Sequence, residues 1–380
     1  MSGFIVKGWC PCAWRPMETG DGLLMRVKPR LSRLTRAQGL ALCELAARFG
    51  NGIIDISRRA HLQIRGVAET DSPALLAELL ALDLVDAGPR MERLRNVLIA
   101  PDWTEGDDTH RIACDLFGRL DRLPDLPGKA GFVIDAGAAP VLIGESGDFR
   151  VERGADGGLI LRADGRSAGA AAPRGGEADM LIALAHWFCE SGGPAKGRMK
   201  RHDAPLPDWA AGTAAPAAGR VRIRPGPLTL GAAPATAHGV AFGQVEAEVL
   251  AGALADPGVA ALRITPWRVV VIEGARQGAV AGLIADAADP LLDAYACPGA
   301  PACPQASVAT RDLARLLAPA VPGTLHVSGC AKGCAFPQPA ETVLTGRDGR
   351  FDLARHARAG SPAQLTDLSP AEVLAHLGVA

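Results

Sequence analysis

The sequence predicts an α+β fold with pseudo-two-fold symmetry, and three observations lead to this prediction. A pattern of one helix followed by two strands occurs twice, in residues 34–67 and in residues 245–275. The two copies lie far apart in the chain, which favours two related halves over a solenoid or a chance likeness. Four cysteines near the C-terminus stand in two pairs among glycines and prolines, which indicates a C-terminal region built around a metal or a cluster.

Length and composition are those of an ordinary folded protein. The chain has 380 residues, 48% of them hydrophobic, and a formal net charge of −1, so we expect about two or three domains and neither nucleic acid nor a membrane as partner. No run of about 18 apolar residues occurs, and the start lacks a signal-peptide core. We therefore expect a cytoplasmic protein, in which the nine cysteines serve metal, cluster or catalytic roles rather than disulfides.

The two copies are read from their periodicity. In the first copy, Leu42, Leu45 and Ala46 recur at helical spacing, and the following Gly-Asn-Gly ends the helix before strands at 53–57 and 60–67. In the second copy a helix ends at Pro257-Gly258, and strands follow at 260–265 and 268–274. Residues 55–66 align with residues 263–274.

The remaining segments complete the predicted order. Between the copies we expect helices at 108–120 and 177–191, a strand at 130–137, a hairpin at 147–165 and a flexible connector at 211–220. After the second copy we expect a helix at 305–320, a strand at 323–329 and a last helix that begins at Ser369. The predicted regions are 1–88 (first repeat), 89–220 (central region ending in the connector), 221–290 (second repeat) and 291–380 (the region of the four cysteines).

The four C-terminal cysteines indicate a metal centre. Cys297 and Cys303 are separated by five residues, and Cys330 and Cys334 by three. Structural zinc sites usually separate paired ligands by two to four residues, so the first pair fits zinc poorly. A [4Fe–4S] cluster needs four thiolates around a box, and flexible loops let the backbone offer N–H groups to its sulfurs. The spacing favours a cluster, with zinc or unliganded thiols as the alternatives.

Several motifs in the right order resemble the sulfite and nitrite reductase family. They are the cysteine spacing, SRRAHLQIRG (57–66), RNVL (95–98), LPGKAGFVID (126–135) and AFGQV (241–245), so the resemblance covers nearly the whole chain. Three further stretches resemble one branch of that family, the precorrin-3B synthases: residues 10–27, 296–306 and 326–362.

The resemblance implies a pseudo-two-fold sulfite/nitrite reductase-like fold. In it, 1–88 and 221–290 are ferredoxin-like repeats, 89–220 binds the tetrapyrrole substrate and 291–380 holds a [4Fe–4S] cluster. The resemblance also implies a reaction. Enzymes of that branch use O2 to hydroxylate C20 of precorrin-3A and close a γ-lactone from the ring A acetate, in aerobic cobalamin biosynthesis. The implied cofactors are a [4Fe–4S] cluster on the four cysteines and a mononuclear non-haem iron, with sirohaem as the alternative. The dinucleotide fingerprint is missing, so an external electron donor is expected, an NAD(P)H-linked protein being one candidate.

The resemblance also carries over individual residues. Arg59 and Arg95 match arginines that face the anion and the tetrapyrrole, and Lys129 matches the first lysine of the Leu-Pro-x-Lys segment. The reductases carry a second lysine where this chain has Gly131, which weighs against sulfite reduction.

Other residues are candidates from their chemistry. Guanidinium groups bind carboxylates in a bidentate manner, so Arg26, Arg58, Arg65 and Arg268 are candidate carboxylate ligands, with solvated surface charge as the alternative. Two-residue alternation places His61 and Gln63 on one face with Arg59, so both are candidate substrate contacts. His61 is also a candidate iron ligand, with a packing role as its alternative.

Two other functions remain open from the sequence. One is a sirohaem-dependent sulfite or nitrite reductase, which Gly131 and the SGCAKGC segment disfavour. The other is a non-catalytic carrier of a cluster or a tetrapyrrole, for which the two-repeat scaffold is more than is needed. The role of Cys10 and Cys12 is not assigned.

Overall fold

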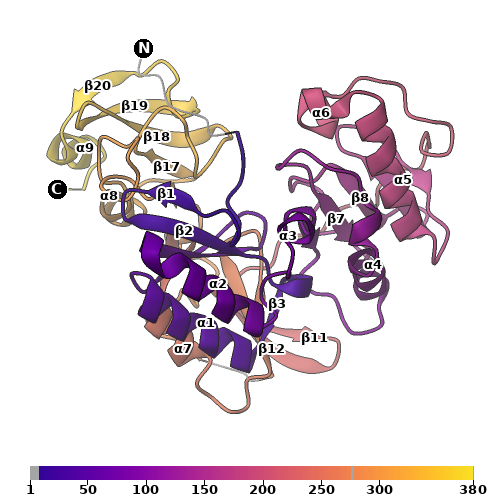
Figure 1. Ribbon diagram of the computed structural model, residues 1–380. Helices are drawn as coiled ribbons and strands as arrows, with labels where there is room; N and C mark the ends of the chain where they lie inside the picture. The colour runs from indigo at the N-terminus through magenta and orange to yellow at the C-terminus, as the bar shows by residue number, and fades with distance from the viewer. Residues whose placement is uncertain (1–7, 275–277, 380) are drawn as a thin grey trace.

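The computed structural model describes residues 8–274 and 278–379. Within them the strands form four five-stranded sheets (Figure 1), one for each helix-strand-strand copy, one in the central region and one at the C-terminus. The structure thus confirms the α+β architecture. None of the helices in these ranges is long and apolar enough to cross a lipid bilayer.

The first sheet has the strand order β1-β2-β5-β4-β13. Its strands are β1 (Met17–Thr19), β2 (Gly22–Val27), β5 (Leu62–Val67), β4 (Ile53–Ile56) and β13 (Gln244–Glu246). The helices α1 (Arg36–Phe49) and α2 (Ser72–Ala81) belong to the same copy. Helix α1 begins at Arg36, because Thr35 and Gln38 form a reciprocal capping box there.

The second copy repeats this plan in the order β11-β12-β15-β14-β3. Its elements are β11 (Gly226–Leu230), β12 (Ala233–Gly239), β15 (Val269–Glu273), β14 (Ala261–Ile264), β3 (Arg33–Thr35) and helix α7 (Ala247–Ala253). Strand β3 comes from the first copy and β13 from the second, so each copy lends one strand to the sheet of the other. The backbone hydrogen bonds of the two exchanged strands therefore hold the copies together.

Backbone conformation supports the internal symmetry. Leu31 and Phe242 precede the two exchanged strands, and both have positive φ, 56° and 57°. Ala60 and Arg268 lie at aligned hairpin positions with φ of 53° and 59°. Residues other than glycine rarely have positive φ, so its occurrence at equivalent positions of the two copies is evidence that they share one backbone architecture.

The central sheet has the order β10-β9-β8-β7-β6. Its elements are β10 (Ala170–Ala171), β9 (Leu159–Ala163), β8 (Phe149–Arg153), β7 (Phe132–Asp135), β6 (Val97–Ile99) and helices α3 (Pro89–Leu94), α4 (Asp108–Phe117), α5 (Glu177–Glu190) and α6 (Gly193–Lys196). The predicted connector at 211–220 is not free of the sheet, because it forms bridges from Ala214 to Gly169 and from Pro216 to Gly154.

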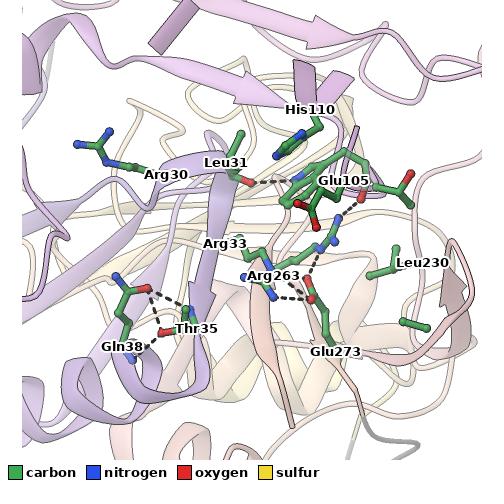
Figure 2. A pocket seen from close by; sticks show the side chains of 13 residues that line it. Arg30, Leu31, Arg33, Thr35, Gln38, Glu105, His110, Leu230, Arg263 and Glu273 are labelled. Atoms are coloured by element: carbon green, nitrogen blue, oxygen red, sulfur yellow. Dashed lines mark hydrogen bonds and ion pairs between the residues drawn. The ribbon is translucent and has the colours of Figure 1, made fainter. Parts of the chain in front are cut away.

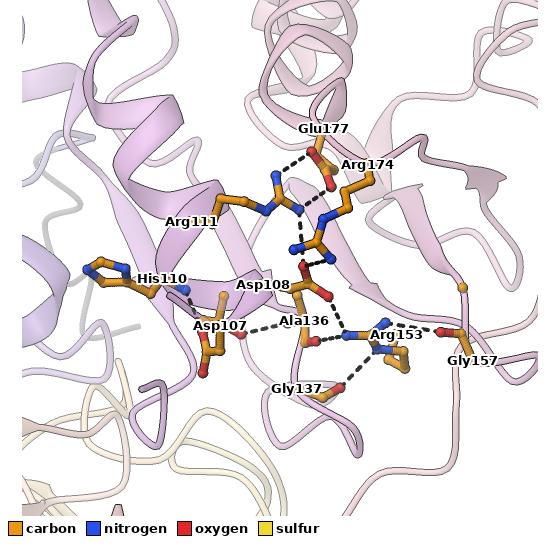
Figure 3. Close-up of polar contacts among 12 residues, drawn as sticks. Asp107, Asp108, His110, Arg111, Ala136, Gly137, Arg153, Gly157, Arg174 and Glu177 are labelled. Atoms are coloured by element: carbon orange, nitrogen blue, oxygen red, sulfur yellow. Dashed lines mark hydrogen bonds and ion pairs between the residues drawn. The ribbon is translucent and has the colours of Figure 1, made fainter. Parts of the chain in front are cut away.

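An ion-pair network joins the helices of the central region to its sheet (Figure 3). Asp108, the first residue of α4, lies within 3.2 Å of the guanidinium groups of Arg111, Arg153 and Arg174. Arg111 also pairs with Glu177 at the start of α5. The network fixes both helix starts to the sheet and lies outside the candidate site.

The C-terminal sheet has the order β16-β17-β18-β19-β20. Its elements are β16 (Ala294–Ala296), β17 (Leu325–Ser328), β18 (Ala340–Arg347), β19 (Arg350–Ala357), β20 (Leu365–Leu368) and helices α8 (Arg311–Leu317) and α9 (Pro370–His376). Short 3-10 helices complete the chain: η1 (Arg30–Ser32), η2 (Glu69–Asp71), η3 (Leu120–Arg122), η4 (Met199–Arg201), η5 (Ala241–Gly243) and η6 (Pro290–Leu292).

Helix α8 is shorter than predicted. The helix expected at 305–320 begins only at Arg311, because the preceding segment is held as a loop against the first cysteine pair. The hydroxyl of Thr310 donates to the carbonyl oxygen of Cys297 at 2.6 Å. The predicted last helix begins, as expected, after its cap Ser369.

Candidate functional site

A cavity of about 610 Å³ brings together the residues that carry the chemistry. Its wall combines the sheet of the first copy, the start of the second copy and the loops of the C-terminal region. Seven predicted cationic or polar residues line it: Arg26, Arg58, Arg59, Gln63, Arg65, Lys129 and Arg268. All four cysteines of the two pairs line it as well: Cys297, Cys303, Cys330 and Cys334.

Sheet topology explains why the two cysteine pairs meet. Strands β16 and β17 are parallel neighbours, so their carboxyl ends lie side by side. Cys297 directly follows β16, and Cys330 comes two residues after β17. The strands therefore deliver one cysteine of each pair to the same edge of the sheet, although 33 positions separate the two in sequence.

The surroundings of Cys297 fit a cluster ligand. Its Sγ accepts the backbone N–H of Gly329 at 3.2 Å. Burial raises the pKa of the Cys297 thiol, N–H donors from Gly329 and Gly299 oppose the rise, and the thiols of Cys303 and Cys330 add to it. Backbone donors aimed at sulfur, with further thiols in electrostatic range, are the donor set that an iron–sulfur cluster uses. Among the residues described, no three His, Cys, Asp or Glu side chains are close enough to hold a single ion.

Arg26 and Arg59 place positive charge on the wall of the same cavity. Nη2 of Arg59 donates to the carbonyl oxygen of Lys129 at 2.7 Å. Burial lowers the pKa of both guanidinium groups, and the nearby Cys10 thiol opposes this. Arginine remains charged in proteins, so both groups are partly desolvated cations, which a nearby anionic group would stabilise.

Gln63 supports the same wall. With its amide oriented to accept, its side-chain oxygen lies 2.7 Å from Nη2 of Arg26 and 3.1 Å from Nε. A neutral acceptor orients the guanidinium without neutralising it.

Two predicted carboxylate ligands are already engaged within the protein. Arg65 contacts both oxygens of Asp21, at 2.9 and 2.7 Å, and donates to Asp55 at 2.9 Å. Arg268 donates to the carbonyl oxygens of Leu292 and Ala294 and lies over the ring of Tyr295. Their guanidinium groups are therefore engaged in contacts that stabilise the cavity wall and are not available to bind a substrate carboxylate.

His61 does not line the cavity, although alternation along the strand predicted that it would. Residues 57–60 form a turn with Ala60 at a φ of 53°, and β5 begins only at Leu62, so the alternation restarts there. The His61 side chain is 3% exposed. Burial, helped by four surrounding cations, holds the pKa of His61 well below its usual value.

Arg95 is also misplaced by the sequence prediction. Its Nε lies 2.9 Å from Asp86 and its Nη2 lies 3.0 Å from Glu92, and the residue lines a separate cavity with Met91 and Phe117. Short-range acidic partners on the same helix and loop draw the side chain away from the candidate site.

Sequence reasoning missed several wall residues. Tyr295, the only tyrosine of the chain, lies between the guanidinium of Arg268 and the ring of Phe336, whose centroid is 4.2 Å away. The sequence could have indicated that Tyr295 lies in the cavity wall, because it precedes Cys297 by two residues. Cys10 lines the cavity, whereas Cys12 does not.

A second cavity of about 490 Å³ occupies the equivalent position in the other copy (Figure 2). Its wall includes Arg263 and Glu273, which align with Asp55 and Arg65 of the candidate site, so the charges are exchanged. Glu273 is paired with both Arg263 and Arg33. No cysteine lines this cavity, so the copies have diverged and one cavity alone meets the C-terminal thiols.

Comparisons with known proteins agree with this geometry. The family model for the nitrite/sulfite reductase ferredoxin-like half domain matches residues 15–82. A precorrin-3B synthase from Sinorhizobium sp. is 32% identical over 400 residues, which cover 95% of this chain and 85% of that protein. A ferredoxin–nitrite reductase from Synechococcus elongatus is 29% identical over 141 residues, 34% of this chain and 27% of that protein.

Among solved structures, the Mycobacterium tuberculosis NirA protein has the same fold. It superposes with a TM-score of 0.67 at 20% identity, covering 92% of this chain and 78% of that one. The likeness confirms the sulfite/nitrite reductase-like fold expected from the sequence.

Proposed function

The chain belongs to the precorrin-3B synthase family, and from this membership we propose that it converts precorrin-3A to precorrin-3B in cobalamin biosynthesis. In this reaction one atom of O2 becomes the hydroxyl group at C20 and the other leaves as water, while the ring A acetate closes the γ-lactone. Two electrons and two protons balance the step, and an external donor supplies the electrons.

One observation carries the proposal: four cysteines and the cations Arg26 and Arg59 line a single cavity. The substrate is a large macrocycle with many carboxylates. Guanidinium groups suit those carboxylates, and apolar residues such as Leu24 and Phe242 in the same wall suit its ring system.

Cys297, Cys303, Cys330 and Cys334 would hold a [4Fe–4S] cluster, which when bound would supply single electrons to the reaction. The protein's own contribution is to bind and orient the macrocycle. Arg59 is anchored through Lys129 and Arg26 through Gln63, so both reach the substrate from fixed positions.

Gly131 supports a synthase over a sulfite reductase. A Cβ at this position would lie 2.6 Å from Nδ2 and 2.8 Å from the carbonyl oxygen of Asn96. Asn96 itself donates to the carbonyl oxygen of Ala130. The backbone around Gly131 therefore leaves no room for the second lysine of the reductases, and one cation that holds a small oxyanion is missing.

The test is turnover by protein purified without oxygen. We expect precorrin-3A, isotopically labelled O2 and a reductant to give a product that carries one labelled oxygen atom, and we expect Cys330→Ser to abolish this. Binding of precorrin-3A without turnover would instead show a carrier. Sharp Soret and red absorption bands with reduction of nitrite or sulfite would show the sirohaem reductase.

A further inference from the structure

Arg311 is a weakly paired cation on the cysteine side of the cavity. It is the first residue of α8, its side chain is 15% exposed, and it lines the cavity that all four cysteines line. Its Nε is buried and has no hydrogen-bond partner among the residues that the structure describes. Its nearest carboxylate oxygen, Oδ1 of Asp55, lies 3.6 Å from Nη2, beyond hydrogen-bond range.

Asp55 is committed elsewhere. Its Oδ2 accepts from Arg65 at 2.9 Å, and Gln244 approaches Oδ1 at 3.4 Å. Arg65 in turn is held by Asp21 through two hydrogen bonds. The four charges form a row, Asp21–Arg65–Asp55–Arg311, in which only Arg311 lacks a close partner.

The Arg311 end of the row lines the same cavity as the thiols. Burial is the main cause that lowers the pKa of Arg311, while Asp55 and the Cys297 thiol oppose this, so both groups lie within electrostatic range of the guanidinium. The pair lies within a partly desolvated wall, where a charge acts more strongly than in water.

We propose that Arg311 sets the reduction potential of the cluster, an inference that rests on the proposed function because it needs the cluster to be bound. Reduction adds one negative charge to the cluster. A fixed cation near a cluster ligand stabilises the added negative charge and so raises the reduction potential. The carboxylate of Asp55 has the opposite effect on the potential. Nearby charge is one of the means by which proteins adjust the reduction potentials of clusters. Arg311 thus acts through the cluster and is a positioned charge, not a catalytic residue.

The test is an anaerobic redox titration of the cluster, followed by visible absorption and electron paramagnetic resonance. We expect Arg311→Gln to disfavour reduction at least about tenfold, which is about 59 mV for one electron. Arg311→Lys keeps the charge and should stay near the wild-type potential, and Asp55→Asn, which removes the opposing charge, should raise it.

Arg315 provides a matched control. It lies one turn further along α8 and is exposed, so Arg315→Gln makes the same change of charge where solvent screens it, and we expect a shift below about threefold. Equal shifts in Arg311→Gln and Arg315→Gln, or a wild-type potential in Arg311→Gln with full cluster content, would refute the proposal.

Should Arg311→Gln bind no cluster, Asp55→Asn decides the matter, since an unchanged or lowered potential there is also contrary to the proposal. Wild-type protein without iron and sulfide would overturn the proposed function instead, so the two failures are distinct.

Discussion

The backbone N–H of Gly20 donates a hydrogen bond of 2.9 Å to the carbonyl oxygen of Ala302. Gly20 lies in the turn between β1 and β2, and Ala302 lies between the first two cysteines of the candidate site. The contact therefore fixes the cysteine loop to the sheet of the first copy, more than 280 positions away in sequence. A Cβ at residue 20 would lie 2.0 Å from the carbonyl oxygen of Pro301, so only glycine fits.

Replacing Gly20 should therefore impair cluster binding without unfolding the protein. We expect Gly20→Ala to displace the loop that carries Cys297 and Cys303 and to lower iron and sulfide content per chain to less than about half. Gly252→Ala is the control, because a Cβ there meets nothing within 4 Å and alanine favours its helix. Equal iron in both variants, measured after identical anaerobic reconstitution, would show that the contact has no such role.

Arg59 should contribute substrate affinity. Hydrogen bonds to charged groups contribute about 1.5–3 kcal/mol, so we expect Arg59→Gln to raise the Kd for precorrin-3A about 10- to 100-fold while cluster content stays unchanged. Arg48→Gln, on the exposed end of α1 where the side chain is 61% exposed, should leave the Kd unaltered. Fluorescence or absorption titration of the bound macrocycle measures both.

The sequence was sufficient for features that depend on local interactions. The break after α1 and the cap at Ser369 each lie within a few residues of the structure that they determine. The convergence of the cysteine pairs was also predictable, because the sequence shows their spacing and predicts the strand that precedes Cys330. These elements were enough to identify the cysteine side of the cavity.

The sequence was insufficient where distant segments decide the outcome. Nothing local indicates that β3 and β13 pair with the opposite sheets. The turn with Ala60 at positive φ moved His61 off the cavity wall, and Asp86 drew Arg95 into an ion pair. A motif match gave the residue type in both cases, whereas the direction of the side chain depended on neighbours that only the fold supplies.

Because Arg95 lies in an ion pair outside the candidate site, we expect it to contribute to stability, whereas Arg59 contributes to substrate binding. Removing one partner of a buried ion pair costs about 3–5 kcal/mol, and Arg95 is 3% exposed between Asp86 and Glu92. We expect Arg95→Gln to lower the free energy of unfolding by about that amount and to leave the Kd for precorrin-3A unchanged. Anaerobic urea denaturation and the binding titration test the two parts. A raised Kd with normal stability would return Arg95 to the substrate site.

Asp135 at the end of β7 makes the stability of the protein depend on pH. Its Oδ2 accepts the backbone N–H groups of Val141 and Leu142 at 2.8 and 2.6 Å, whereas its buried Oδ1 has no partner among the described residues. Burial is the main cause that raises the pKa of Asp135 to about 6, above the value of about 3.9 in an unfolded chain.

Between about pH 4 and about pH 6 the folded protein therefore holds a proton that the unfolded chain has lost. Stability from this group falls as pH rises through that window and is constant above it. We expect Asp135→Asn to remove this loss, so that its stability relative to wild type increases by on the order of 2 kcal/mol from pH 4 to pH 7 in urea denaturation.

Asp179→Asn is the control with the opposite sign. Hydrogen bonds from Arg119 and then Arg122 lower the pKa of Asp179 on the surface. Its carboxylate stabilises the folded state at neutral pH, and this small contribution is lost as pH falls below about 4. If Asp135→Asn instead tracks wild type at every pH, the Asp135 carboxylate is ionised in the folded protein with a normal pKa, and its buried Oδ1 is compensated by solvent.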